Sequence, residues 1–168
     1  NVALISQSGA GMSGIVDCEQ RIQFNFAVSS GYELTVAMED YLDYALDLPE
    51  TRVVGLFLET SRYPEKLIQA FKKANQLNIP IVVLKVGRTD LAAELAISHS
   101  GALAGSDQCY SALFDQYGVQ RVADMDQLAT TLIMFAQPKV VSEGGLVCLH
   151  DSGGERQLLI DLADSADV

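Results

Sequence analysis

Residues Val53–Phe71 read VVGLFLETSRYPEKLIQAF, and this stretch decides the fold class. Its first six residues are apolar or glycine without alternation, which is typical of a strand inside a parallel sheet. A short polar turn follows. Pro64 then favours the first position of a helix, and Leu67, Ile68 and Phe71 recur on one helical face. The stretch therefore predicts one strand–helix unit of an α/β protein.

The same alternation of strand and helix occurs five times along the chain. Strands are predicted at Val2–Ile5, Phe24–Val28, Val53–Leu58, Pro80–Val86 and Val119–Val122. Such alternation implies a parallel sheet with helices on both faces, joined by right-handed crossovers. Ligands of these folds collect outside the carboxyl ends of the strands. Polar, glycine-bearing or charged loops are expected at that edge at Ser6–Gly9, Ser29–Gly31 and Glu59–Arg62.

The pattern starts again near Gly144, with a predicted strand at Leu146–Leu149 and a helix that follows Gly154. We therefore expect a first domain over residues 1–140 and the first strand–helix unit of a second domain over residues 141–168. A sixth strand of the same sheet is the alternative. The chain begins without methionine and stops just after a predicted helix, which predicts a piece of a longer polypeptide.

Composition excludes several classes of partner. The net charge is −11, and lysine and arginine are not clustered, which argues against nucleic acid or an anionic membrane surface. No apolar run approaches the roughly 20 residues that cross a bilayer. Three cysteines at unrelated spacings predict reduced thiols, a cytoplasmic protein and no metal site. An acidic domain of this kind would hold phosphate with backbone amides and helix N-termini.

One candidate for such a phosphate site is the loop Ser8-Gly9-Ala10-Gly11, which leads from the first strand into a helix. Small residues there leave backbone amides accessible at the positive end of the helix dipole. The loop lacks the lysine of a P-loop and the spacing of a dinucleotide fingerprint. An ordinary tight strand–helix turn is the alternative interpretation.

A second candidate site is Ser98–Gly105, SHSGALAG, which surrounds one of the two histidines with small residues. A neutral His99 imidazole can act as a base, a ligand or a nucleophile near neutral pH. Glu59 could accept a hydrogen bond from one ring nitrogen and leave the other free to attack. The alternative is a glycine-rich turn with an incidental histidine. His150 is interpreted as structural, and Arg62 and Arg88 as anion contacts or surface ion pairs.

Several motifs together resemble the ligase domain of NDP-forming acyl-CoA synthetases, a family that includes ADP-forming acetyl-CoA synthetase and the succinyl-CoA synthetase alpha subunit. The motifs are Ile5–Ala10, Val28–Gly31, Pro49–Thr51, Pro80–Arg88, Ser98–Gly105 and Gly118–Val122. The resemblance covers Asn1 to about Gln137. It implies a flavodoxin-like three-layer sandwich with a five-stranded parallel sheet, followed by the first βα unit of another flavodoxin-like domain.

The resemblance also implies roles for individual residues. His99 matches the histidine that is transiently phosphorylated, and Glu59 matches the glutamate that orients it. The phosphate loop matches Ser8, Gly9, Ala10 and Gly11, and the histidine loop matches Ser98, Ser100, Gly101, Ala102 and Gly105. Ser100 replaces the usual threonine but keeps the hydroxyl, and Tyr32 stands where the family often has asparagine.

The implied reaction converts acyl-CoA, phosphate and NDP into a carboxylic acid, CoA and NTP through an acyl phosphate and a phosphohistidine. No cofactor is expected on this chain alone, and the full bacterial-type enzyme is expected to use CoA, ATP/ADP or GTP/GDP, magnesium and phosphate. The expected partners are an upstream CoA-binding domain, an ATP-grasp domain or subunit, and a small carboxylic acid; a homo-oligomer is compatible with the sequence. The fragment alone should be inactive. The alternative is an acyl-CoA-sensing regulatory domain of a protein acetyltransferase fusion.

Overall fold

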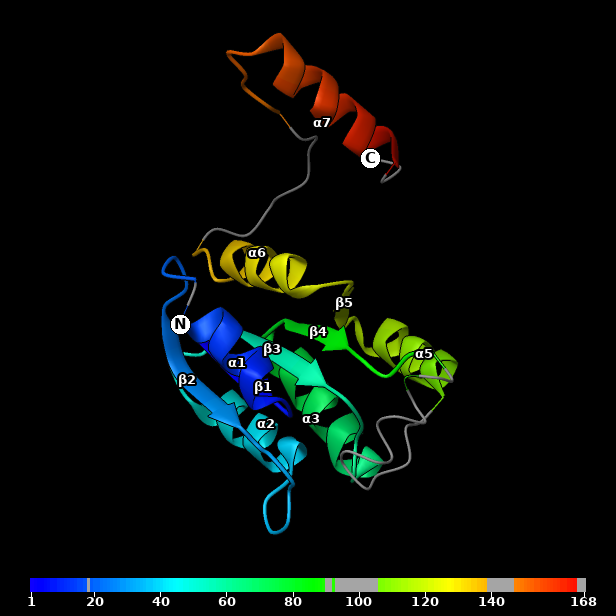
Figure 1. Ribbon diagram of the computed structural model, residues 1–168. Helices are drawn as coiled ribbons and strands as arrows, with labels where there is room; N and C mark the ends of the chain where they lie inside the picture. Colours follow the sequence, from blue (N-terminus) through cyan, green and yellow to red (C-terminus); the bar gives the residue numbers. More distant parts are fainter. Residues whose placement is uncertain (18, 90–91, 93–105, 139–146, 166–168) are drawn as a thin grey trace. The chain divides into compact units, whose positions relative to one another are not determined.

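The computed structural model describes residues 1–17, 19–89, 92, 106–138 and 147–165. The chain forms two compact units, Asn1–Pro138 and Lys139–Val168 (Figure 1). Each unit is described by itself below. The predicted histidine loop, residues 98–105, lies outside the described residues.

The first unit is built on a five-stranded, wholly parallel sheet with the strand order β2-β1-β3-β4-β5. The strands are β1 (Val2–Ser6), β2 (Phe24–Ser29), β3 (Val53–Leu58), β4 (Ile81–Lys85) and β5 (Gln120–Val122). The predicted strands are confirmed, with boundaries that differ by at most one residue at either end. The three central strands are almost wholly buried, which explains their continuous apolar runs.

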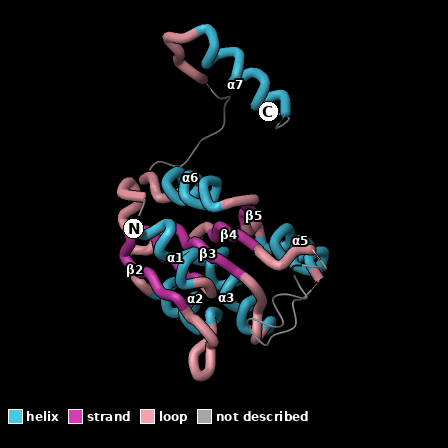
Figure 2. Tube along the Cα trace, viewed as in Figure 1, coloured by secondary structure: helices cyan, strands magenta, loops and turns pink. Residues whose placement is uncertain are grey.

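Helices cover both faces of the sheet (Figure 2). One face carries α2 (Met38–Asp47), α3 (Pro64–Leu77) and α5 (Asp107–Tyr117), and the other carries α1 (Gly9–Val16) and α6 (Met125–Phe135). Each face has its own apolar core, centred on residues of β1, β3 and β4 that point to opposite sides. The result is the predicted flavodoxin-like three-layer sandwich.

The helix ends follow local sequence signals. Pro64 occupies the first turn of α3, Gly118 ends α5 in the left-handed conformation, and the Asp124 carboxylate caps α6 by accepting from the Gln127 amide at 2.8 Å. The start of α1 lies inside the predicted phosphate loop Ser8–Gly11. The helix begins at Gly9 because the Ser8 hydroxyl caps it there.

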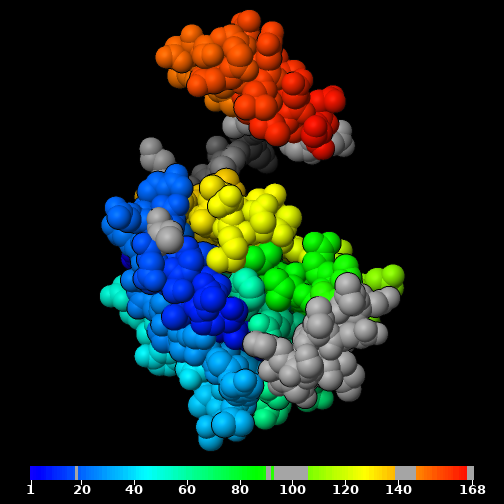
Figure 3. Space-filling model, in the orientation of Figure 1, coloured from blue at the N-terminus to red at the C-terminus, as the bar shows by residue number. Residues whose placement is uncertain are grey.

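Helix α6 packs closely on β3 at Gly55. A Cβ atom at this position would lie 2.9 Å from Cδ1 of Leu132, which is fully buried, and 3.2 Å from Cδ1 of Leu4. Glycine is therefore required by the close approach of the helix to the sheet. Figure 3 shows this side of the unit, with the blue surface of α1 beside the yellow surface of α6.

The carboxyl end of β4 contains a buried charge. Lys85 is 2% exposed, and its ammonium group donates to the carbonyl oxygen of Glu59 at 2.6 Å and to that of Val86. The Tyr110 ring lies below the ammonium, with its centroid 4.8 Å away. Desolvation is the main cause that lowers the Lys85 pKa to about 8, because burial disfavours the charged amine.

In the second unit, α7 (Gly153–Ser165) is confirmed but the predicted strand at Leu146–Leu149 is not. Residues 147–150 have no strand conformation, and Val147 and Leu149 are exposed. A parallel strand needs a hydrogen-bonded neighbour, and none pairs with these residues in the described part of the chain. The start of a second domain here and its alternative, a sixth strand of the first sheet, both stay predictions.

Across the described ranges, no helix is long and apolar enough to span a membrane.

Replacement of Gly55 by valine should lower the free energy of unfolding by about 1–3 kcal/mol, because the added methyl groups overlap buried Leu132. Gly14→Ala is the matched control. Its Cβ would meet Met125 Cε at 3.7 Å, an ordinary contact, and alanine favours the helix. Urea unfolding of both variants measures the difference. A Gly55→Val protein as stable as wild type would contradict the packing described here.

The stability of the first unit should depend on pH through Lys85. Its pKa is about 8 when folded and 10.5 in the unfolded chain, so the unfolded chain binds the extra proton between these values. The contribution of Lys85 to stability therefore rises with pH across that window, by at most about 1.4 kcal/mol per pH unit. Urea unfolding of wild type and Lys85→Met across the window measures this rise. A pH-independent difference between the two proteins would contradict it.

Candidate functional site

The candidate site lies where the chain reverses its direction of winding across the sheet. β1 and β3 are neighbours, but the chain leaves β1 toward β2 on one side and β3 toward β4 on the other. The loops after β1 and β3 therefore diverge and leave a crevice at their carboxyl ends, where ligands of open α/β sheets bind. A pocket of about 360 Å³ lies at this point; it is lined by Gln7, Ser8, Gly9, Ala10, Gly31, Tyr32 and Glu59.

The first wall of the pocket is the N-terminus of α1. The Ser8 hydroxyl accepts from the Gly11 amide at 3.1 Å, and the Ser6 hydroxyl accepts from the Ser8 amide at 3.1 Å. Among the described residues, nothing accepts from the amides of Gly9 and Ala10, the first two positions of the helix. Both residues line the pocket, so the dipole of α1 and two backbone donors favour an anion there.

Gly11 has a different role from its two predecessors. Its amide is already bonded to the Ser8 hydroxyl, so this donor is used within the loop. A Cβ atom at Gly11 would lie 3.0 Å from the ring of Phe57. The glycine therefore allows α1 to lie close to β3, which brings the helix N-terminus beside the end of that strand.

The second wall of the pocket is Glu59, the residue that follows β3. Its side chain is half-buried, and its backbone is held on both sides. The Gln7 side-chain oxygen accepts from the Glu59 amide at 2.7 Å, and the Lys85 ammonium donates to the Glu59 carbonyl at 2.6 Å. The sequence-predicted residues Ser8, Gly9, Ala10 and Glu59 thus share one pocket.

Gln7 and Glu33 are site residues that the sequence did not reveal. Besides the Glu59 amide, Gln7 bonds the amide of Thr60 at 3.0 Å and its carbonyl at 2.7 Å. Its side-chain nitrogen also donates to Glu33 at 2.9 Å. Gln7 therefore joins the loops that follow β1, β2 and β3. The sequence shows Gln7 between two serines after a strand, but a glutamine in a loop does not by itself indicate a functional role.

Glu33 is a buried carboxylate in the loop after β2. Its side chain is 1% exposed, and it accepts from Gln7, the Ser30 hydroxyl at 2.7 Å, the Met38 amide at 3.1 Å and Arg62 Nε at 3.1 Å. The backbone of Glu33 has φ +53°, a left-handed conformation that is uncommon outside glycine. Four donors hold this strained residue, so the loop is fixed by charge rather than by an apolar core.

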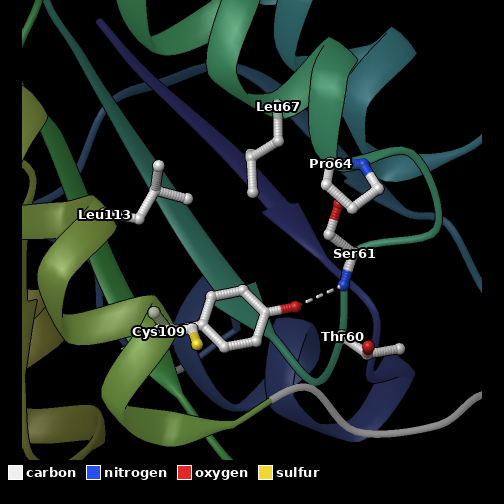
Figure 4. A pocket seen from close by; sticks show the side chains of 7 residues that line it. Thr60, Ser61, Pro64, Leu67, Cys109 and Leu113 are labelled. Atoms are coloured by element: carbon white, nitrogen blue, oxygen red, sulfur yellow. Dashed lines mark hydrogen bonds between the residues drawn. The ribbon is translucent and has the colours of Figure 1, made fainter.

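A second pocket, of about 330 Å³, lies beside the same strand end between α3 and α5 (Figure 4). Its lining is mainly apolar and consists of Thr60, Ser61, Pro64, Leu67, Cys109, Tyr110 and Leu113. The Tyr110 hydroxyl accepts from the Ser61 amide at 2.8 Å and so ties α5 to the turn after Glu59. The second pocket contains none of the predicted site residues.

The remaining predicted residues divide into two groups. His99 and its loop residues Ser98, Ser100, Gly101, Ala102 and Gly105 lie outside the described residues, so their distances to Glu59 are not part of the structure. Arg62 forms an ion pair with Glu33, Arg88 lies 3.9 Å from Asp107, and His150 is exposed in the second unit. Within the described ranges, no group of histidine, cysteine and carboxylate side chains could hold a metal ion.

Known proteins resemble the chain in both sequence and fold. It is 33% identical to a 4-hydroxybutyrate–CoA ligase (ADP-forming) of Nitrosopumilus maritimus over 99% of the chain and 24% of that protein. It is 32% identical to the alpha subunit of acetate–CoA ligase (ADP-forming) II of Pyrococcus furiosus over 98% of the chain and 36% of the subunit. The chain thus spans only a quarter to about a third of the length of these curated relatives.

A solved structure has the same fold. The acetyl-coenzyme A synthetase 1 of Ca. Korarchaeum cryptofilum, determined with phosphate and ADP, superposes with a TM-score of 0.68 at 32% identity. The match covers 79% of this chain and 29% of that one. The sequence profile of the succinyl-CoA ligase like flavodoxin domain matches residues 1–135, which include every strand of the sheet and the whole pocket. The chain therefore belongs to the family of succinyl-CoA ligase like flavodoxin domains.

Proposed function

We propose that this chain is the phosphoryl-carrying part of an NDP-forming acyl-CoA synthetase, with His99 as the residue that carries the phosphoryl group. The observation that supports the proposal is the pocket at the β1–β3 crevice, which combines a carboxylate with two helix N-terminal amides that have no acceptor among the described residues. The pocket offers partners to both an anion and an imidazole. The amides of Gly9 and Ala10 donate to the phosphoryl oxygens, and the Glu59 carboxylate accepts a hydrogen bond from the imidazole N–H.

In the proposed reaction, phosphate first displaces CoA from acyl-CoA and forms an acyl phosphate. One imidazole nitrogen of His99 then attacks the phosphorus. The bond from phosphorus to the acyl oxygen breaks, and the carboxylate leaves. The other ring nitrogen carries the hydrogen and donates a hydrogen bond to the Glu59 carboxylate, which keeps the attacking nitrogen unprotonated. The terminal phosphate oxygen of NDP later attacks the same phosphorus, so NTP forms and neutral His99 is restored.

The residues around these groups have supporting roles. Ser8 shapes the anion site by capping α1, and Gly11 allows the helix to approach β3. The small residues of the histidine loop, Ser98, Ser100, Gly101, Ala102 and Gly105, allow its backbone to approach the phosphoryl group closely. No lysine or arginine lines the described pocket, so backbone dipoles supply the positive potential in this acidic chain.

The whole activity requires more protein than this chain. Its relatives are about three to four times as long, and one of them is the alpha subunit of an ADP-forming ligase. We propose that CoA, the nucleotide with magnesium, and the small carboxylic acid bind with the help of further domains or of a second subunit. Residues 141–168 would then begin a second domain, and the chain alone would not turn over substrate.

Replacement of His99 by asparagine in the full-length protein should abolish phosphoryl labelling from γ-labelled ATP and magnesium. The wild-type label should be labile in acid and stable in base, as a phosphoramidate is. His150→Asn is the matched control, because His150 is exposed in the second unit and should leave the label intact. Label that persists in His99→Asn would overturn the assignment of His99.

Replacement of Glu59 by glutamine should slow labelling by up to about 10⁴-fold, the loss typical of a catalytic histidine without its orienting carboxylate. Glu65→Gln is the control, since Glu65 is exposed on the first turn of α3. Rapid-quench measurement of the label gives the rate. A Glu59→Gln enzyme that labels as fast as Glu65→Gln would show that Glu59 does not act on the histidine.

A further inference from the structure

We infer that Gln7 and Lys85 are positioning residues that hold Glu59 in place from the two neighbouring strands, an inference that rests on the function proposed for Glu59. Glu59 stands one residue beyond β3, where the backbone hydrogen bonds of the sheet end on both sides. A residue in such a place has a free backbone unless other groups bind it.

On the β1 side, the regular bonding stops at Gln7. The Gln7 amide donates to the carbonyl of Phe57 at 3.1 Å, and the chain then turns into α1. The next bonds are made by the Gln7 side chain, whose oxygen accepts from the amides of Glu59 at 2.7 Å and Thr60 at 3.0 Å. The Gln7 side chain thus makes the hydrogen bonds that the backbone of β1 would have made if the strand continued.

On the β4 side, a different side chain has the same role. The Val86 amide donates to the carbonyl of Leu58 at 3.0 Å, and the chain then turns at Gly87, which has φ +71°. The Lys85 ammonium donates to the carbonyl of Glu59 at 2.6 Å and also to that of Val86. The amide and the carbonyl of Glu59 are therefore bound by side chains from opposite neighbours.

The orientation of the Gln7 carboxamide is fixed by its partners. Its oxygen faces two N–H donors, and its nitrogen faces two acceptors, the Thr60 carbonyl at 2.7 Å and the Glu33 carboxylate at 2.9 Å. A flipped amide would place donors against donors at one end and acceptors against acceptors at the other. Glu33 is in turn held by Arg62 and the Met38 amide, so Gln7 cannot rotate without breaking a buried ion-paired cluster.

The two side chains satisfy backbone groups of Glu59 that the neighbouring strands leave without partners. They also have a geometric effect, because fixing the backbone of Glu59 fixes the direction in which its carboxylate leaves the sheet. Hydrogen bonds from supporting residues commonly hold catalytic groups in this way.

A double-mutant cycle in the full-length enzyme tests the inference. Gln7→Met and Lys85→Met remove the polar groups at nearly constant shape, in the wild-type and the Glu59→Gln backgrounds. Each should slow His99 labelling at least about tenfold in the wild-type background and less than about twofold where Glu59 is already glutamine, because both act through Glu59. Equal fold losses in the two backgrounds would overturn the inference. The exposed residues Gln76 and Lys72 provide the matched controls Gln76→Met and Lys72→Met.

Hydrogen exchange supplies a readout that does not depend on the enzymatic activity. Gln7→Met should raise the exchange rates of the Glu59 and Thr60 amides by about tenfold or more, with no change at the Leu56 amide inside β3. Unchanged exchange at Glu59 would overturn the inference even if labelling falls. If wild-type enzyme forms no phosphohistidine, the proposed function fails, while the exchange data still decide whether Gln7 holds this backbone.

Discussion

The site depends on one constraint, the end of backbone pairing where β1 and β3 part. Two strands that run side by side must separate there because their helices lie on opposite faces of the sheet. The separation creates the pocket, but it also removes the hydrogen-bond partners of the residues that line it. Gln7 and Lys85 replace those partners with side-chain groups, and Glu33 stabilises Gln7 in turn. The separation of β1 and β3 therefore both forms the pocket and makes the supporting side chains necessary.

The separation of the strands also explains how an acidic chain can offer a binding site for an anion. The positive potential comes from the first turn of α1, whose small residues permit the helix to start directly at the pocket and to lie close to β3. Among the described residues, the one buried ammonium near the site is that of Lys85, and it points to backbone carbonyls instead. Its charge therefore helps to hold the backbone of Glu59, and the proposed anion site relies on backbone amides.

Most of the fold could be predicted from the sequence, and much less of the site. Apolar runs such as Val53–Leu58 mark buried strands directly, and signals such as Pro64 and Gly118 mark helix ends. The strand predicted at Leu146–Leu149 is not confirmed at residues 147–149, because an apolar run forms a strand only when a neighbouring strand pairs with it. The histidine loop was singled out by composition and lies outside the described residues.

The sequence did not reveal Gln7 and Glu33, because their importance lies in a contact between two loops that are 26 residues apart. A polar residue in a loop also belongs to no periodic pattern from which its role could be predicted.

The backbone of Glu33 is strained, and its side chain holds the loop together. Glycine would relax this conformation but could not accept from the four donors, so the bonds that Ser30, Met38 and Arg62 make to this residue depend on one carboxylate. Opening of that loop breaks the bonds that Gln7 and Arg62 make to Glu33. The exposed side chains of Tyr32 and Leu34 lie in the same loop, which is joined to the segment after β3 by the Glu33 carboxylate and by the bond from Arg62 to the Tyr32 carbonyl.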